Sequence, residues 1–183
     1  MPSAADDPLM GHTVLAVPVP ALEEVVRERT AFYDRSFVSA DTGFAHAHIT
    51  VLGPWVPAPT ADDRTAVAEI AATTTCFEVK LAQLHEFPDG LLHLRPEPDD
   101  ELRLLTRRLA AAFPAHPPYG GEFSDVVPHL TLDQRSSTVT PEAVHARVAH
   151  LLPATVPVDR IDLQWWANHD CRLLQTFPLQ RDM

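Results

Sequence analysis

The sequence predicts a two-lobed α+β protein built from a unit of helices and strands that occurs twice. The order strand, helix, strand, helix, strand can be read over residues 12–87 and again over residues 88–180. Neither half is clearly long enough to be stable alone, so the two halves should pack together. We therefore expect residues 1–183 to form a single bilobal domain, with a cleft near its local two-fold axis.

The first repeat begins with an apolar segment and ends with an alternating one. We expect strands at 12–19, 45–52 and 77–84, and helices at 21–33 and 60–74. The second strand should stop at Gly53-Pro54, because this pair favours a turn. The segment from Thr60 to Asp63 resembles a capping box, which marks the start of the second helix.

The second repeat has the same order and is followed by one further strand. We expect strands at 91–95, 126–132, 156–167 and 172–178, and helices at 99–113 and 140–152. Thr140 is a good N-cap, and Pro141 suits the first position of a helix. The prolines and glycines of residues 114–123 predict an irregular segment.

Equivalent strands of the two repeats carry the same four-residue pattern. His48-Ile-Thr-Val51 and His129-Leu-Thr-Leu132 both read His, apolar, Thr, apolar. Side chains alternate between the faces of a strand, so each His shares a face with its Thr. The apolar pairs should be buried, and the polar pairs should point into the cleft. Two such boxes are expected by chance only about once in sixty chains of this composition.

His48, Thr50, His129 and Thr131 suit the hydrolysis of a ribose cyclic phosphate. One imidazole can take a proton from water while the other protonates the departing oxygen, because an ordinary histidine has a pKa near 6.5. The threonine hydroxyls can donate to the non-bridging phosphate oxygens, where negative charge builds up. This chemistry requires no metal or other cofactor, and the sequence contains no convincing set of metal ligands.

The two boxes resemble those of the 2H phosphoesterase superfamily, also called the 2'-5' RNA ligase-like family. The likeness covers nearly the whole chain. It includes an early strand ending in Val17-Pro18, the continuation of the first box into Leu-Gly-Pro-Trp55, the Phe87-Pro88 and Arg95–Pro98 segments, the stretch PPYGGEF before the second box, and the two closing strands.

The resemblance implies a bilobal α+β fold with two antiparallel-rich sheets lining a central cleft and helices outside. It also implies that His48, Thr50, His129 and Thr131 are the catalytic set. Family activities include opening 2',3'-cyclic phosphates, cleaving 2'-5' linkages and the reverse joining of RNA. Many members have an arginine directly after the second box, where this chain has Asp133. A phosphate contact is therefore not carried over to that position.

Composition limits the partners that we expect. The net charge of −11 disfavours sequence-independent binding of long nucleic acid, which needs a broad basic surface. A small nucleotide or one RNA end remains compatible with it. No apolar run could span a membrane, and Asp6 and Asp7 lie where a secretion signal would carry positive charge. We therefore expect a cytoplasmic protein, and a monomer.

Three further residues are candidates for substrate contact. Trp55 and Tyr119 could stack on a nucleobase, or could serve as lobe packing and as a loop anchor. His46 shares a face with His48 and could extend the site, although we favour a solvated position at the strand entrance. A cupin-like metal site at His46 and His48 is disfavoured because the glutamate that it needs is absent. The competing class of function is a nucleotide-binding or sensor module that uses the same cleft without turnover.

Overall fold

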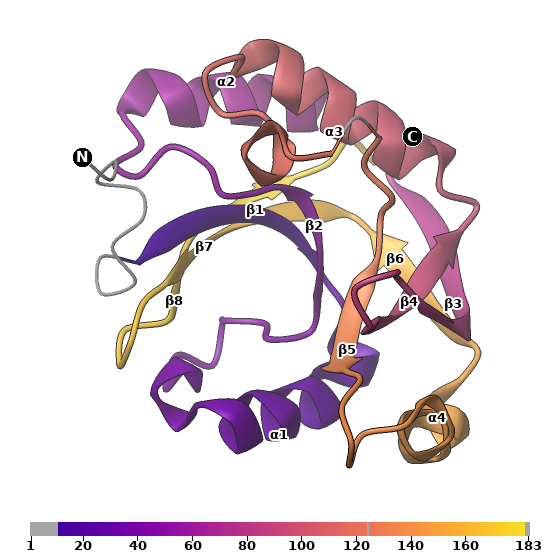
Figure 1. Cartoon of the computed structure of the whole chain (residues 1–183). Helices are drawn as coiled ribbons and strands as arrows, with labels where there is room; N and C mark the ends of the chain where they lie inside the picture. The colour runs from indigo at the N-terminus through magenta and orange to yellow at the C-terminus, as the bar shows by residue number, and fades with distance from the viewer. Residues whose placement is uncertain (1–10, 124, 182–183) are drawn as a thin grey trace.

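The computed structural model describes residues 11–123 and 125–181. Its strands form two four-stranded sheets in which all neighbours are antiparallel (Figure 1). The first sheet has the order β2 (His48–Leu52), β1 (His12–Pro18), β7 (Arg160–Trp166) and β8 (Arg172–Pro178). The second has the order β5 (Leu130–Gln134), β4 (Leu91–Glu97), β3 (Phe77–Glu86) and β6 (Ala154–Val158). The α+β class and the two antiparallel sheets are confirmed.

Helices cover the sheets from two sides. Helices α2 (Ala61–Ala72) and α3 (Asp100–Ala112) lie side by side, and they pack against β8 and β2 respectively. Helix α1 (Glu23–Tyr33) lies on the opposite side, where it contacts β5, and α4 (Pro141–Val148) lies near it (Figure 1). Helix α1 thus links the N-terminal part of the chain to a strand that is about 100 residues away in sequence.

The first box lies on the edge strand β2, and the second box begins one residue before the edge strand β5. In the first sheet, Ala16 of β1 is in register with Thr50 of β2. In the second sheet, His93 of β4 is in register with Thr131 of β5. The edge strands β2 and β5 contact one another. The boxes are therefore brought together where the edges of the two sheets meet.

The alternation within each box positions its side chains as the sequence predicts. Ile49 and Val51 of the first box are buried, as are Leu130 and Leu132 of the second. They belong to one hydrophobic core that extends between both sheets and the helices. Burying a side chain of this size contributes about 1.5–3 kcal/mol relative to leaving it exposed. The core thus fixes which face of each edge strand points into the cleft.

The two repeats do not coincide with the two sheets. We expected lobes at residues 12–87 and 88–180, but β3 of the first repeat lies in the second sheet. Strands β7 and β8, from the end of the chain, complete the first sheet. The reason is local, because β3 and β4 are joined by a tight turn in which Gly90 has a positive φ of 88°. Strands joined in this way pair with each other.

Other boundaries also differ from the prediction. The expected strand at 156–167 is two strands, β6 and β7, which belong to different sheets and are separated at Asp159. The strand expected at 126–132 begins only at Leu130. The predicted helix starts are confirmed, since Thr60 and Asp63 form a capping box and the Thr140 hydroxyl accepts from the Ala143 N–H.

The acidic N-terminal segment with Asp6 and Asp7, on which the expected cytoplasmic location depends, lies outside the described residues. Within the part of the chain that the structure describes, no helix combines the length and the apolar character needed to cross a membrane.

Candidate active site

The four residues of the boxes meet at one cavity. His48, Thr50, His129 and Thr131 all line a space of about 430 Å³ between α1, β2 and β5. The rest of its lining includes apolar side chains such as Val26, Phe37 and Trp166. The cavity therefore combines two imidazoles and two hydroxyls with walls that can hold an apolar ring.

The two imidazoles are held in the same way. Nδ1 of His48 lies 2.8 Å from the carbonyl oxygen of His46, and Nδ1 of His129 lies 2.8 Å from that of Val127. A carbonyl can only accept, so Nδ1 carries the proton in each ring. No described residue hydrogen-bonds to Nε2 of either ring. In the neutral form, each box thus offers an unprotonated Nε2 for proton transfer.

Electrostatics differ between the two rings. Burial lowers the pKa of His48, while the bond to the His46 carbonyl and the negative charge of Glu23 act against that shift. Burial also lowers the pKa of His129; the bond to Val127 opposes this shift, and the positive charge of Arg95 adds to it. The negative charge of Asp89 also opposes the shift of the His129 pKa. Burial, the largest cause for both rings, therefore biases both towards the neutral form.

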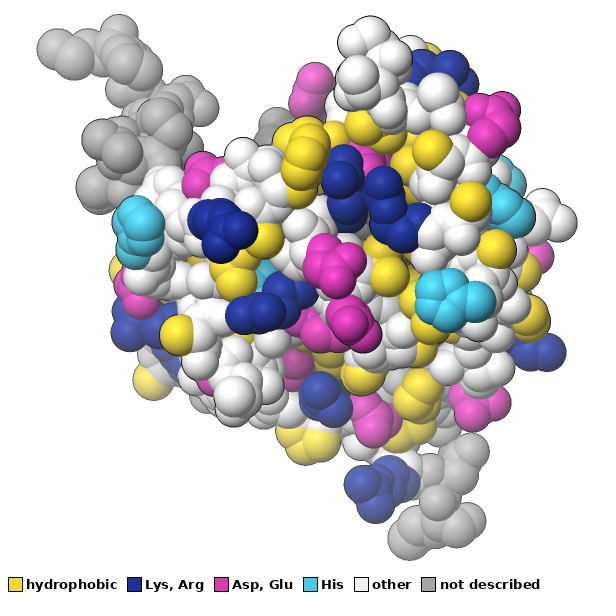
Figure 2. Space-filling model, turned by 90° about the horizontal axis from the view of Figure 1, so that it is seen from below, with side chains coloured by type: hydrophobic (Ala, Val, Ile, Leu, Met, Phe, Trp, Pro, Cys, Tyr) yellow, Lys and Arg dark blue, Asp and Glu magenta, His cyan; other side chains and the backbone are white. Residues whose placement is uncertain are grey.

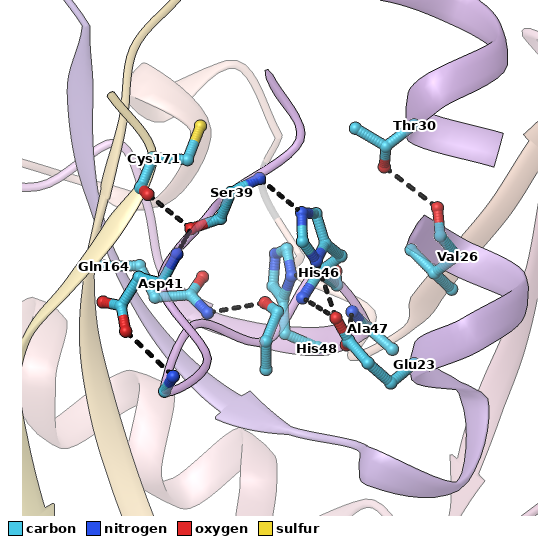
Figure 3. Close-up of polar contacts among 12 residues, drawn as sticks. Glu23, Val26, Thr30, Ser39, Asp41, His46, Ala47, His48, Gln164 and Cys171 are labelled. Carbon is cyan, nitrogen blue, oxygen red and sulfur yellow. Dashed lines mark hydrogen bonds and ion pairs between the residues drawn. The ribbon is translucent and has the colours of Figure 1, made fainter. Parts of the chain in front are cut away.

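His46 supports His48 from behind. It is only 3% exposed, so the solvated position that we favoured is wrong. Figure 3 shows its ring between Glu23 of α1 and Ser39. The Ser39 N–H donates to Nε2 at 3.0 Å, and Nδ1 lies 2.6 Å from the Glu23 carboxylate. Both ring nitrogens of His46 are thus hydrogen-bonded within the protein, and this anchors the start of the strand. His46 also lines the cavity of the two boxes.

Glu23 completes this support. Its carboxylate also accepts from the backbone N–H groups of His46 and Ala47, at 3.1 and 2.9 Å. Burial raises the pKa of Glu23, but these hydrogen bonds outweigh burial and the pKa is lowered overall. Glu23 is thus an anion that holds the start of β2 against α1. Sequence reasoning missed it, because 25 residues separate it from His48 and no pattern connects them.

A third histidine packs against His129. His93 on β4 is fully buried and stacks on Phe87, with ring centroids 3.8 Å apart. Both rings meet His129 nearly edge-on, at centroid distances of 5.4 Å for His93 and 5.0 Å for Phe87. Burial lowers the pKa of His93 to about 4. A neutral aromatic wall therefore fixes the orientation of the His129 ring.

Sequence reasoning did not place His93 in the site. In the structure, Nε of Arg95 lies 3.4 Å from Nε2 of His93. The Arg95 guanidinium thus lies next to the wall around His129, and it is the cation that acts on the pKa of both rings.

Tyr119 lies beside the boxes. Its ring is nearly parallel to that of His129 at a centroid distance of 6.3 Å, and its backbone N–H donates to the Gly53 carbonyl at 2.8 Å. Tyr119 also lines a second cavity of about 340 Å³, together with His48, Thr50 and Trp166. The predicted loop residue is therefore adjacent to the site, where a substrate ring could reach it.

Trp55 does not lie in the cleft. It is 2% exposed and packs edge-on against Phe113 in the core. The suggested stacking on a nucleobase is therefore corrected, and the alternative of lobe packing describes its position. Trp166 is the tryptophan that lines both cavities; its ring is 5.5 Å from that of His48.

The donor sets of the site do not resemble a metal centre. Among the described residues, no three or more His, Cys, Asp or Glu side chains are grouped so that they could hold a metal ion. The chemistry that this arrangement offers is proton transfer by two imidazoles and hydrogen bonding by two hydroxyls.

Fold and site together define a class of protein: a two-sheet α+β protein in which paired His-x-Thr boxes on edge strands share one cavity. The sequence matches the family described as the 2'-5' RNA ligase superfamily over residues 17–170. The chain therefore belongs to this superfamily, whose members are 2H phosphoesterases. This membership supports a phosphodiesterase or ligase type of activity.

Several solved structures share this fold. LigT of E. coli, complexed with 3'-AMP, is 19% identical, with a TM-score of 0.55 over 92% of this chain and 98% of that one. TT0787 of Thermus thermophilus is 16% identical, with a TM-score of 0.56 over 94% and 100% of the chains. A structure described as a phosphoesterase is 17% identical, with a TM-score of 0.53 over 95% and 99%. No significant match was found among curated proteins.

Proposed function

We propose that this chain is a phosphodiesterase that hydrolyses 2',3'-cyclic phosphates or 2'-5' phosphodiesters of nucleotides or RNA ends. The same site would also catalyse the reverse 2'-5' joining of RNA. The observation that carries this proposal is the matched anchoring of His48 and His129, which leaves an Nε2 of each ring available at one cavity. Binding alone would not need two proton-transfer groups.

The reaction follows from general acid–base catalysis. One imidazole takes a proton from water through Nε2 as the water oxygen attacks phosphorus. The bond from phosphorus to one ribose oxygen breaks, and the protonated second imidazole gives its proton to that oxygen. Hydroxyls of Thr50 and Thr131 donate to the non-bridging oxygens as their charge grows. A cyclic phosphate thus becomes a phosphomonoester and a free ribose hydroxyl, and no metal is required.

Small nucleotides are the substrates that we favour. Solved structures of LigT contain 3'-AMP, ATP and NADP+. For this chain, the size of the cavity and its apolar walls support a nucleotide of similar size. The net charge of −11 argues against a long nucleic acid held by its backbone.

The test is phosphorus NMR with a panel of 2',3'-cyclic nucleotides and 2'-5' dinucleotides, in the presence of a chelator. Turnover by the wild type, lost in both His48→Ala and His129→Ala, would support the two-histidine mechanism, and the product shift would give the regiochemistry. Activity that survives in both variants would overturn the mechanism. Binding without turnover would favour a nucleotide sensor.

A further inference from the structure

Asp133, directly after the second box, is the centre of a buried ionic cluster. Its side chain is fully buried and lies 2.7 Å from Nε of Arg29 and 3.2 Å from Nη1 of Arg147. The Tyr33 hydroxyl donates to its Oδ1, and the backbone N–H of Gln134 donates to the same atom. Burial raises the pKa of Asp133, but these partners outweigh burial and lower it. Asp133 is therefore an anion with two cations beside it.

The cluster joins α1 to β5 across the cleft. Arg29 and Tyr33 come from α1, which also carries the Glu23 that holds β2. The face formed by α1 and α4 shows arginine and acidic side chains interspersed at its centre (Figure 2). Two guanidinium groups share one carboxylate, so the three groups together have one uncompensated positive charge.

Arg29 is the member of this cluster that can act on a ligand. It lines the cavity of the two boxes, whereas Arg147 does not. Its guanidinium is held against the rings of Phe32 and Tyr33, at 4.3 and 5.1 Å from their centroids. Its Nε is buried against Asp133 at 2.7 Å, and its Nη2 lies 3.5 Å from the Tyr33 hydroxyl. Among the described residues, Nη1 has no hydrogen-bond partner, so this donor remains for a ligand.

Asp34, the residue that directly follows α1, also lines this cavity and brings a negative charge to it. Its carboxylate accepts from the Ser36 N–H at 2.9 Å, and its side chain is exposed. Water screens an exposed charge far more than a buried one. The Arg29 side chain is only 13% exposed, so its charge acts more strongly within the cavity than that of Asp34.

The position of the cluster defines what Arg29 could bind. Thr131 and Asp133 are two residues apart on β5, so their Cα atoms are at most about 7 Å apart, and both residues line the cavity. The reacting phosphate lies beside Thr131 under the proposed function, so Arg29 lies roughly one ribose away from it. We propose that Arg29, held by Asp133 and Tyr33, binds the 5'-phosphate of the nucleotide whose 2',3'-phosphate reacts.

This inference rests on the proposed function and adds a substrate class to it. A free mononucleotide with a 5'-phosphate and the last nucleotide of an RNA both present this group. The group is a monoester in the first and a diester in the second. Arg29 thus supplies a cation to the cavity from α1, although Asp133 occupies the position where many relatives have an arginine.

The experiment compares a nucleoside 2',3'-cyclic phosphate with its 5'-phosphorylated form in steady-state kinetics. A charge-assisted contact of this kind should lower KM for the 5'-phosphorylated form by about 10–100-fold in the wild type. In Arg29→Gln this preference should fall to near one, and Arg29→Lys should keep part of it. Arg147→Gln is the matched control, because it removes the other cation on the same carboxylate. It should keep the preference.

Three results would overturn the inference: no preference in the wild type, a preference that survives Arg29→Gln, or a preference lost equally in Arg147→Gln. Thermal unfolding of both variants checks that each folds. Dissociation constants of both ligands, measured by calorimetry on His48→Ala with and without Arg29→Gln, give the same comparison without turnover. If the wild type shows no turnover but binds the 5'-phosphorylated ligand more tightly than the unphosphorylated one, the proposed function is contradicted and the inference is supported.

Discussion

His48 donates its Nδ1 proton to the carbonyl oxygen of His46 at 2.8 Å, and this bond fixes which nitrogen of the imidazole is free. His129 makes the equivalent bond to Val127. The carbonyl in each case is two residues before the histidine. The same short stretch of backbone thus sets both the position and the tautomer of each imidazole.

The first prediction concerns pH. Burial lowers the pKa values of His48 and His129 in the free protein, so the charged form of each ring is disfavoured. The bell-shaped profile of kcat/KM should therefore be centred below pH 6.5, because this parameter reports the free enzyme. A bound phosphate anion stabilises a protonated ring, so the profile of kcat should lie at higher pH. Coinciding profiles above pH 6.5 would contradict this account.

The second prediction concerns Glu23. Its negative charge raises the pKa of His48, so Glu23→Gln should lower that pKa further and reduce kcat at neutral pH. Histidine titration by NMR measures the first effect directly. Glu24→Gln is the matched control, since Glu24 is exposed on the same turn of α1. If His48 titrates alike in both variants, Glu23 does not act on the His48 ring.

The third prediction concerns His93 and stability. Its pKa is about 4 in the folded state, against an ordinary value near 6.5 in the unfolded chain. The unfolded state then binds more protons as pH falls from 6.5 to 4, so the folded state loses stability over this range. Urea unfolding at several pH values should show a smaller loss for His93→Gln than for the wild type. An equal loss of stability in the two proteins would contradict this role of His93.

The fourth prediction separates Trp55 from Tyr119. Trp55→Ala should destabilise the fold by about 3–5 kcal/mol, because it leaves a cavity against Phe113 in the core. Tyr119→Ala removes a half-buried ring beside His129 and should instead raise KM. Urea unfolding and steady-state kinetics on both variants test this. A raised KM in Trp55→Ala, with Tyr119→Ala unchanged, would reverse the assignment.

Local features of the sequence were predictable because their physics is local. The capping box at Thr60 and the cap at Thr140 depend on residues within one helical turn. The inward and outward faces of both boxes follow from the alternation of a strand. The placement of Trp55 was open in sequence terms, because a tryptophan after a strand can pack in a core or face a cleft. Its contact with Phe113 comes from a distant helix end.

The sequence by itself determined the two boxes, the faces on which they lie and the family to which the chain belongs. Only the tertiary structure decided which strands share a sheet. Strands β7 and β8 lie more than 100 residues after β1 in the sequence, yet they complete the sheet beside it. The tertiary structure also decided the surroundings of each imidazole: Glu23 and His46 behind His48, and Phe87 and His93 around His129. The effects of charges and of ring contacts depend on distances in space, and the separation of residues along the chain does not specify these distances.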